Sequence, residues 1–151
     1  MDYTITINPE NWSVFLTTTP YKFAFRETMS GELRKIKVGD RFVVYLAQEM
    51  CWCGIFKVSN LPYKSSEPVY KSDPSFSMVV EVSEIFLPKS DQYISIKEPE
   101  LWNKLDRFSG LNRKKDGWIY NAKLARSLTK ILNSDTEQIL NFFNQQTLKG
   151  K

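Results

Sequence analysis

The chain has 151 residues, of which 42% are hydrophobic and 14% aromatic, and its formal net charge is +4. This is the size of one ordinary domain, with enough apolar side chains for a buried core. It contains no histidine, which excludes Ser-His and Cys-His nucleophiles and nearly every transition-metal site. We therefore expect no cofactor and no metal. The modest positive charge suits a polyanionic partner, although many proteins without such a partner share it.

The N-terminal residues show neither the basic segment nor the apolar run of a signal peptide, and no apolar stretch approaches the length of a membrane span. We expect a cytoplasmic, monomeric protein that does not bind membranes. Cys51 and Cys53 are the only cysteines. Two residues apart on a strand, they would share a face without disulfide geometry, so we expect reduced thiols that pack in the core.

The first third predicts a strand, a helix and a second strand. Residues 3–7 alternate side chains and are rich in β-branched types, which favours a strand. Asn8 and Pro9 then mark a helix start, with Pro at the first helical position. Residues 21–25 indicate a brief strand, and a polar loop follows at 28–31.

The middle third predicts a hairpin followed by a long connection. Residues 37–40 form a turn that leads into an apolar strand at 41–46, and 53–58 follows closely enough to be its antiparallel partner. The stretch 61–75 is rich in Ser, Pro and Lys. A connection of this length inside a compact domain is more often functional than idle. It ends in a further strand at 76–82.

The last third changes to a helical period. A short helix is predicted at 99–105, a longer one at 122–132, and a closing helix at 134–143 with Ser134 as its cap. Strands that do not alternate with helices indicate an α+β protein, and the aromatic-rich hairpins favour a strongly bent sheet or small barrel. We expect a single domain over residues 1–145 and a flexible tail at 146–151.

Four segments resemble the EVE family of the PUA-like superfamily, whose relatives include the YTH domains that bind methylated adenine in RNA. Their order and spacing carry the resemblance, above all a Lys-x-Gly-Asp turn followed by an apolar strand and a Gly-led strand. The resemblance implies a pseudo-barrel of about six strands with peripheral helices, and a cleft that holds an extruded base between aromatic faces. The segments are ITINPENW at 5–12, LRKIKVGD at 33–40 with VVY at 43–45, GIFKV at 54–58, and Trp118 leading into 122–132.

The resemblance also implies which aromatic residues wall the pocket. Phe23 falls where YTH-like relatives place a Trp, and Trp52 falls just before the Gly of the fourth strand. Tyr70 and Phe76 flank the variable connection that supplies another cage aromatic in relatives. Because a Phe ring stacks less area and has a weaker electrostatic face than Trp, Phe23 implies an altered pocket or a different ligand. Core packing is the alternative for Phe23, which shares a strand face with Phe25, and for Trp52.

Two further groups are base-binding candidates. Asn11 matches a helix position where relatives use an amide to read the base edge, and Asn offers both a donor and an acceptor. Backbone groups around Ala24 would supply the remaining hydrogen bonds. Helix capping is the alternative for both Asn8 and Asn11, and it is favoured for Asn8 because Pro9 follows.

Basic residues form several clusters, which are usually solvated surface. Arg113, Lys114 and Lys115 instead lie in a segment with Gly and Asn, where flexible cations can follow a phosphate backbone. We predict that these three residues bind phosphate.

These features favour a non-catalytic module that recognises a flipped, methylated base in DNA or RNA. The chain has no phosphate loop of the GxxxxGK[ST] type, so a nuclease or motor would be a separate effector protein. One alternative is a metal-dependent nuclease, for which Glu81 and Glu84 are the nearest approach to an acidic site. The other is a domain that binds a peptide or small molecule in the aromatic cleft.

Overall fold

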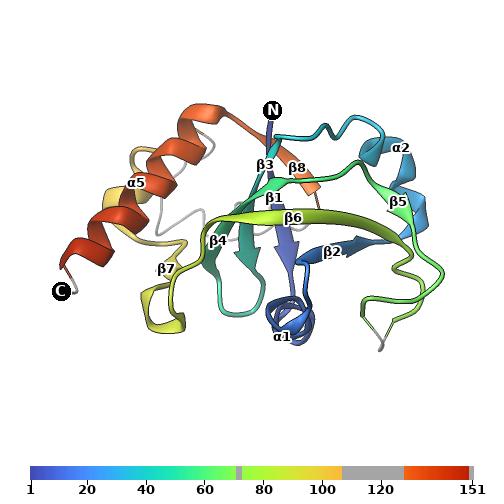
Figure 1. Cartoon of the computed structure of the whole chain (residues 1–151). Coiled ribbons are helices and arrows are strands. Elements are labelled where there is room, and N and C mark those ends of the chain that lie inside the picture. The colour runs from blue at the N-terminus through green and yellow to red at the C-terminus, as the bar shows by residue number, and fades with distance from the viewer. Residues whose placement is uncertain (71–72, 107–127, 150–151) are drawn as a thin grey trace.

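A strongly curved mixed sheet forms the centre of the protein (Figure 1). The computed structural model describes residues 1–70, 73–106 and 128–149. Six strands follow one path in the order β2-β6-β4-β3-β1-β8, while β5 pairs with β6 and β7 pairs with β4. The strands are β1 (Asp2–Ile7), β2 (Lys22–Phe25), β3 (Arg41–Leu46), β4 (Cys51–Val58), β5 (Tyr63–Lys64), β6 (Met78–Phe86), β7 (Ile94–Ser95) and β8 (Leu128–Ile131).

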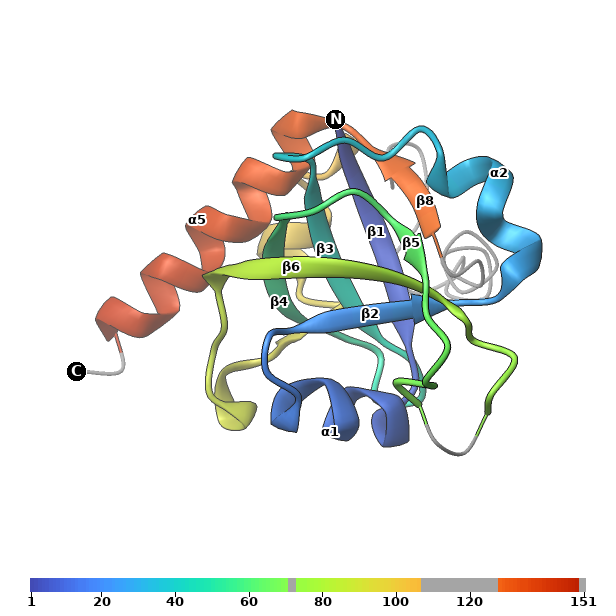
Figure 2. The same ribbon diagram turned by 45° about the vertical axis from the view of Figure 1, so that its right-hand side comes forward.

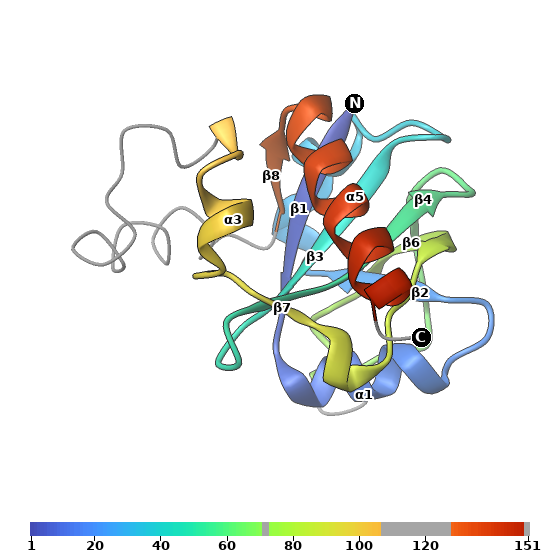
Figure 3. The same cartoon turned by 90° about the vertical axis from the view of Figure 1, so that its left-hand side faces the viewer.

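Helices surround this sheet, so the predicted α+β class with a half-barrel of six strands is confirmed. Helix α1 lies across one end of the half-barrel (Figure 2), whereas α3 and α5 lie together on the opposite side (Figure 3). The helices are α1 (Pro9–Thr17), α2 (Ser30–Leu33), α3 (Pro99–Trp102) and α5 (Asn133–Lys149), with short 3₁₀ turns η1 (Glu27–Met29) and η2 (Ser90–Gln92).

The predicted hairpin is confirmed as β3 and β4, which pair antiparallel, while β3 pairs in parallel with β1 on its other side. The turn before β3 depends on Gly39, whose φ of 95° is a conformation that side chains disfavour. Asp40 closes this turn by accepting a hydrogen bond from the Lys37 amide at 2.9 Å. Gly54 lies opposite Val44, where an added Cβ would approach the Phe56 ring to 2.9 Å. Local sterics therefore explain both Gly39, which lies in the turn before β3, and Gly54 in β4.

The helix predicted over 122–132 is wrong at its carboxyl end. Residues 128–131 form strand β8, which pairs antiparallel with β1; residues 122–127 lie outside the described part. Leu128 and Ile131 are both buried, which a helical stripe also required. The spacing of Leu128 and Ile131 is therefore compatible with a helix and with a strand. The segment forms a strand because it pairs with the open edge of β1.

The closing helix is confirmed, but it begins at Asn133 and ends at Lys149. Ser134 therefore lies inside the helix and is not its cap. The predicted domain boundary at residue 145 also falls within α5. Among the described residues no helix is long and apolar enough to cross a membrane.

The two faces of the sheet pack into two separate cores. On β3, Phe42 and Val44 point to one face, whereas Val43 and Tyr45 point to the other, as the period of two requires. The first cluster, which we call the barrel core, includes Trp12, Phe15, Phe23, Phe42, Val44 and Phe56. The second, the α5 core, includes Val43, Tyr45, Trp52, Ile55, Trp102 and Phe143.

Candidate functional site

A cavity of about 220 Å³ lies where the curved sheet fails to close on itself. Strand β2 is the end of the sheet path, so one of its edges is unpaired. In the described part of the chain, strand β8 pairs with β1 from Asp2 to Ile5, and the next residues of β1, Thr6 and Ile7, line the cavity together with residues of β2. We call this cavity the seam pocket. It is lined by Ile5, Thr6, Ile7, Asn8, Asn11, Phe23, Ala24, Phe25, Ala47, Tyr70 and Phe76.

The start of α1 places Asn11 at the seam pocket. Asn8 caps the helix, since its side-chain oxygen accepts a hydrogen bond from the Asn11 backbone amide at 2.8 Å, and Pro9 follows it. The capping prediction for Asn8 is therefore confirmed. The Asn11 side chain lines the pocket and makes no hydrogen bond to another described residue. Its amide thus keeps one donor group and one acceptor for a ligand.

The free edge of β2 brings backbone polar groups to the same cavity. The Ala24 amide donates to the Tyr70 hydroxyl at 3.3 Å, away from the neighbouring strand β6. Because the N–H and C=O of one strand residue point to the same edge, the Ala24 carbonyl also faces this side. The Ala24 amide is thus already bonded, and the carbonyl is the group that remains for a ligand. Burial raises the pKa of Tyr70 to about 12, so its hydroxyl is neutral at physiological pH.

Four aromatic residues, Phe23, Phe25, Tyr70 and Phe76, line the seam pocket, which confirms the prediction of an aromatic cage. Phe23 is only 1% exposed, and its ring stacks on Phe15 with centroids 4.2 Å apart. Tyr70 and Phe76 meet at a tilt of 60° with centroids 5.5 Å apart. Phe76 is half-buried and is therefore the ring most open to an incoming ligand.

An arginine holds Phe76 in place at the rim. The Arg26 guanidinium carbon lies 4.9 Å from the centroid of the Phe76 ring, within the range of a cation–π contact. The same guanidinium binds Asp73 at 3.3 Å and the Ser75 hydroxyl at 3.2 Å. Asp73 also accepts hydrogen bonds from Ser75, and these bonds lower the pKa of its carboxyl. The end of the long connection is thus tied to β2 through Arg26.

Trp52 does not reach the seam pocket. Its side chain is fully buried in the α5 core, where it meets Tyr45 edge-to-face at 5.8 Å. Neighbouring residues on a strand point to opposite faces, so Cys51 and Cys53 join the barrel core and Trp52 turns away from it. The expected slot between Phe23 and Trp52 is therefore not formed. The buried indole N–H of Trp52 has no hydrogen-bond partner among the described residues.

The cysteine prediction is confirmed, because Cys51 and Cys53 are both free and buried. Burial, with a contribution from Glu49, raises the pKa of Cys51 to about 11. Burial also holds the pKa of Cys53 well above its ordinary value. Both thiols are thus protonated near neutral pH, which disfavours a nucleophilic role.

The described residues offer no acidic metal site, since no group of three or more His, Cys, Asp or Glu side chains converges among them. Glu81 instead accepts hydrogen bonds from Asn60 at 2.6 Å and from Tyr63 at 3.2 Å. The predicted phosphate-binding residues 113–115 lie outside the described part of the chain.

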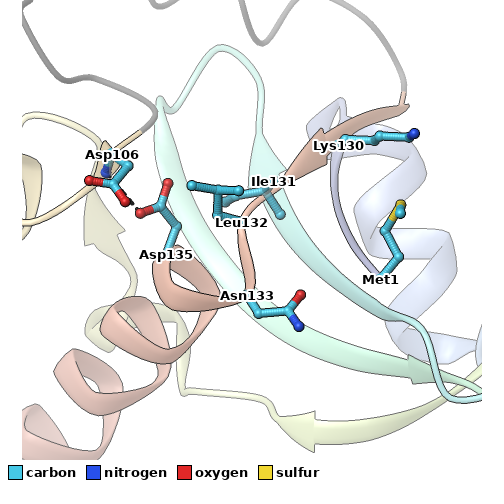
Figure 4. A pocket seen from close by; sticks show the side chains of 7 residues that line it. All are labelled: Met1, Asp106, Lys130, Ile131, Leu132, Asn133 and Asp135. Carbon is cyan, nitrogen blue, oxygen red and sulfur yellow. Dashed lines mark hydrogen bonds between the residues drawn. The ribbon is translucent and has the colours of Figure 1, made fainter.

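A larger cavity of about 510 Å³ lies between β8, the start of α5 and the N-terminus (Figure 4). Ile131 and Leu132 form its apolar wall, and Asp135 accepts a hydrogen bond from the Asp106 amide at 2.8 Å. None of the described residues that line it is aromatic. Its described lining therefore offers no stacking surface, and the smaller seam pocket is the better candidate for a base.

Comparison with known proteins supports the fold through structure alone. No protein-family model matches the sequence, and no curated protein matches it. The YTH domain of Mmi1, solved in complex with RNA, superimposes with a TM-score of 0.64 at 16% identity, over 98% of this chain and 80% of that chain. The fold is that of EVE and YTH domains. The predicted resemblance is therefore confirmed at the level of architecture.

Two further solved structures share this EVE/YTH fold. Human THYN1, in complex with DNA containing 5-methylcytosine, matches with a TM-score of 0.58 at 15% identity, over 94% of this chain and 96% of that chain. The YTH domain of Zygosaccharomyces rouxii MRB1, in complex with N6-methyladenosine RNA, matches with a TM-score of 0.62 at 10% identity, over 94% and 86% of the two chains.

Of the six predicted base-binding residues, five line the seam pocket and only Trp52 does not. Sequence reasoning did not assign the other described lining residues to the pocket, among them Thr6, Ile7 and Ala47. The break between strand and helix at Asn8 was a usable signal for the first two, because strand ends beside a helix start often border sites. No sequence signal marked Ala47.

Proposed function

We propose that this protein is a non-catalytic reader that binds nucleic acid and accepts one extruded, methylated base in the seam pocket. The observation that carries the proposal is the Asn11 side-chain amide, which bonds no other described residue and meets the free edge of β2 and four aromatic residues in one cavity. An amide that both donates and accepts can read the edge of a base. The rings replace part of the stacking that the base loses when it leaves its strand.

The size of the cavity supports a ligand no larger than a single base. Its volume of about 220 Å³ lies below the roughly 300–1,000 Å³ of sites for drug-sized ligands. A peptide side chain would also fit, but the cavity combines flat apolar walls with amide and carbonyl groups, which suits a planar heterocycle that has its own donors and acceptors. The complexes of THYN1 with methylated DNA and of MRB1 with methylated RNA support this assignment for the shared fold.

Each group then has a role. The Asn11 amide and the Ala24 carbonyl read the base edge, while Phe76 and Tyr70 contact its face. Phe23 forms the floor, since Phe15 covers one side of its ring. Outside the pocket, Arg113, Lys114 and Lys115 bind phosphates and add affinity without sequence preference. Any cleavage of the recognised nucleic acid belongs to a separate effector protein.

The proposal is tested by fluorescence anisotropy with labelled DNA and RNA strands that differ only at one cytosine or adenine, unmodified or methylated. We expect a methylated strand to bind more tightly than its unmodified counterpart. Asn11→Ala should weaken binding by about 1–3 kcal/mol, because the base edge is left without its partner. Phe76→Ala should weaken it by about 1–3 kcal/mol through lost stacking.

Ser13→Ala is the matched control on the same helix. The Ser13 hydroxyl is exposed and bonds only the Pro9 carbonyl, at 3.1 Å, so we expect unchanged binding. The proposal fails if no strand binds, or if Asn11→Ala and Phe76→Ala both bind like the wild type.

A further inference from the structure

The described residues that line the seam pocket carry no formal charge. Its described lining consists of aliphatic and aromatic side chains together with Thr6, two asparagines and the Tyr70 hydroxyl, and it includes no Asp, Glu, Lys or Arg. Tyr70 stays neutral because its pKa is about 12. These described residues therefore offer a ligand dipoles but no counter-charge.

Two of the aromatic rings that line the pocket, Phe23 and Phe76, already have a partner. Phe15 stacks on Phe23 at 4.2 Å. The guanidinium carbon of Arg26 lies 4.9 Å from the centroid of the Phe76 ring, so this ring already has one cation in contact with it. A second cation on the same ring would be repelled by the first.

The carboxylate of Asp73 does not supply this counter-charge. Asp73 is bound to Arg26 and Ser75, and it is not part of the pocket lining. Glu27 lies one residue from Arg26 in sequence, but its carboxylate pairs with Lys64 at 3.0 Å. Asp73 and Glu27 are thus each paired with a cation of the protein.

We infer that the seam pocket selects its base by charge: it admits an uncharged base and rejects one that methylation of a ring nitrogen has made cationic. The inference rests on the proposed function. Moving a cation from water into a cavity without a counter-charge is costly, whereas a neutral methylated base loses only hydrogen bonds that Asn11 and Ala24 can replace. The methylation that this reader recognises is therefore one that leaves the base neutral, as methylation on carbon or on an exocyclic amine does.

The test compares strands that carry isomeric methylated bases. The bases of each pair differ in the position of the methyl group and, at neutral pH, in charge. Single strands carrying one 5-methylcytosine are compared with strands carrying 3-methylcytosine, and N6-methyladenine is compared with 1-methyladenine, each in DNA and in RNA. At neutral pH the second member of each pair is cationic. We expect it to bind at least roughly tenfold more weakly than its neutral isomer.

A pH series separates charge from the position of the methyl group. Above the pKa of 3-methylcytosine or 1-methyladenine the base becomes neutral, while Tyr70 keeps its proton because its pKa is about 12. The ratio of affinities between the isomers should then shrink. The neutral isomer is measured at the same pH as a reference. Any effect of pH on the contacts to the phosphates is common to both strands and cancels in the ratio of their affinities. A ratio that does not move with pH overturns the inference, because the methyl position and not the charge then sets it.

Two substitutions test the same point from the protein side. Asn11→Asp keeps the shape of the side chain and adds a counter-charge, so we expect it to shift the ratio toward the cationic base by at least roughly tenfold. Arg26→Gln removes the cation over Phe76 and should shift the ratio in the same direction by roughly two- to fivefold, as for an exposed charge. Lys64→Gln is the matched control, because it also breaks an exposed ion pair and should leave the ratio unchanged.

The outcomes separate the two proposals. Binding of neutral methylated strands that Asn11→Ala weakens, together with equal or tighter binding of the cationic isomers, overturns the charge selection and leaves the reader function standing. Failure of every strand to bind overturns both. Weak binding of the cationic isomers that is rescued by alkaline pH, and by Asn11→Asp, supports the inference.

Discussion

The barrel core and the α5 core lie on opposite faces of one sheet, and both contain several aromatic side chains. They differ in what lies beside each core at the surface of the protein. On the barrel side, the free edge of β2 lies near the carboxyl end of β1, and residues of both strands line the seam pocket. On the other side, α3 and α5 lie against the sheet (Figure 3), and Trp52 is fully buried.

This difference shows that an aromatic residue becomes a ligand wall through its place in the sheet and not through its size. Phe76 is smaller than Trp52, yet it stands at the rim of a cavity with a cation over its ring. Trp52 contributes more buried area but is sealed among other side chains. The following changes test the contrast, from the largest expected effect to the smallest.

Replacing Trp52 by Ala should lower the free energy of unfolding by about 3–5 kcal/mol, because it leaves a cavity in the α5 core. Urea denaturation followed by circular dichroism measures this, since the change removes a fluorophore. Trp52→Phe should cost less, because the buried indole N–H has no partner to lose. If Trp52→Ala kept full stability and instead lost base binding, the assignment of Trp52 to the core would be wrong.

The same reasoning applies to Phe23, which is 1% exposed although it lines the seam pocket. Phe23→Ala should also destabilise the fold by about 3–5 kcal/mol, so loss of binding in that variant would not by itself identify a ligand contact. Phe76→Ala avoids this ambiguity because Phe76 is half-buried.

Tyr70→Phe should lower the free energy of unfolding by about 1–3 kcal/mol, because the buried Ala24 amide loses the hydroxyl that accepts its hydrogen bond. The variant also has a pH signature. Burial raises the pKa of Tyr70 to about 12, so the folded state holds this proton more tightly than the unfolded state. The resulting stability is present below about pH 10 and is lost as the pH rises toward 12.

Comparison of wild type and Tyr70→Phe isolates this contribution from the other buried tyrosines and thiols. Unfolding experiments between pH 9 and about 11 should show a flatter decline for the variant. Parallel declines for both proteins would contradict the buried, neutral state of Tyr70.

Substituting Arg113, Lys114 and Lys115 together by Gln should leave the preference for a methylated base unchanged but weaken binding to every strand. Each lost phosphate contact reduces the slope of log affinity against log salt by about 0.7–0.9. Titrations over a range of NaCl concentrations measure that slope. An unchanged slope would remove these residues from the phosphate interface and assign the affinity to the face around the seam pocket.

The sequence by itself determined the elements whose signals are local. Asn8 and Pro9 start α1, Gly39 makes the turn before β3, and the hairpin follows from its apolar pattern, because each depends on residues close in the chain. These signals, with the resemblance to EVE domains, also identified Asn11, Phe23, Ala24, Tyr70 and Phe76 as residues of one site.

Only the tertiary structure decided what depends on distant partners. Leu128 and Ile131 fit a helix as well as a strand until the open edge of β1 pairs with them. Trp52 fits a pocket as well as a core until its strand register turns it toward α5. In both cases the sequence fixes the side chain, but its surroundings come from segments far along the chain, and the free energy of those contacts outweighs local preference.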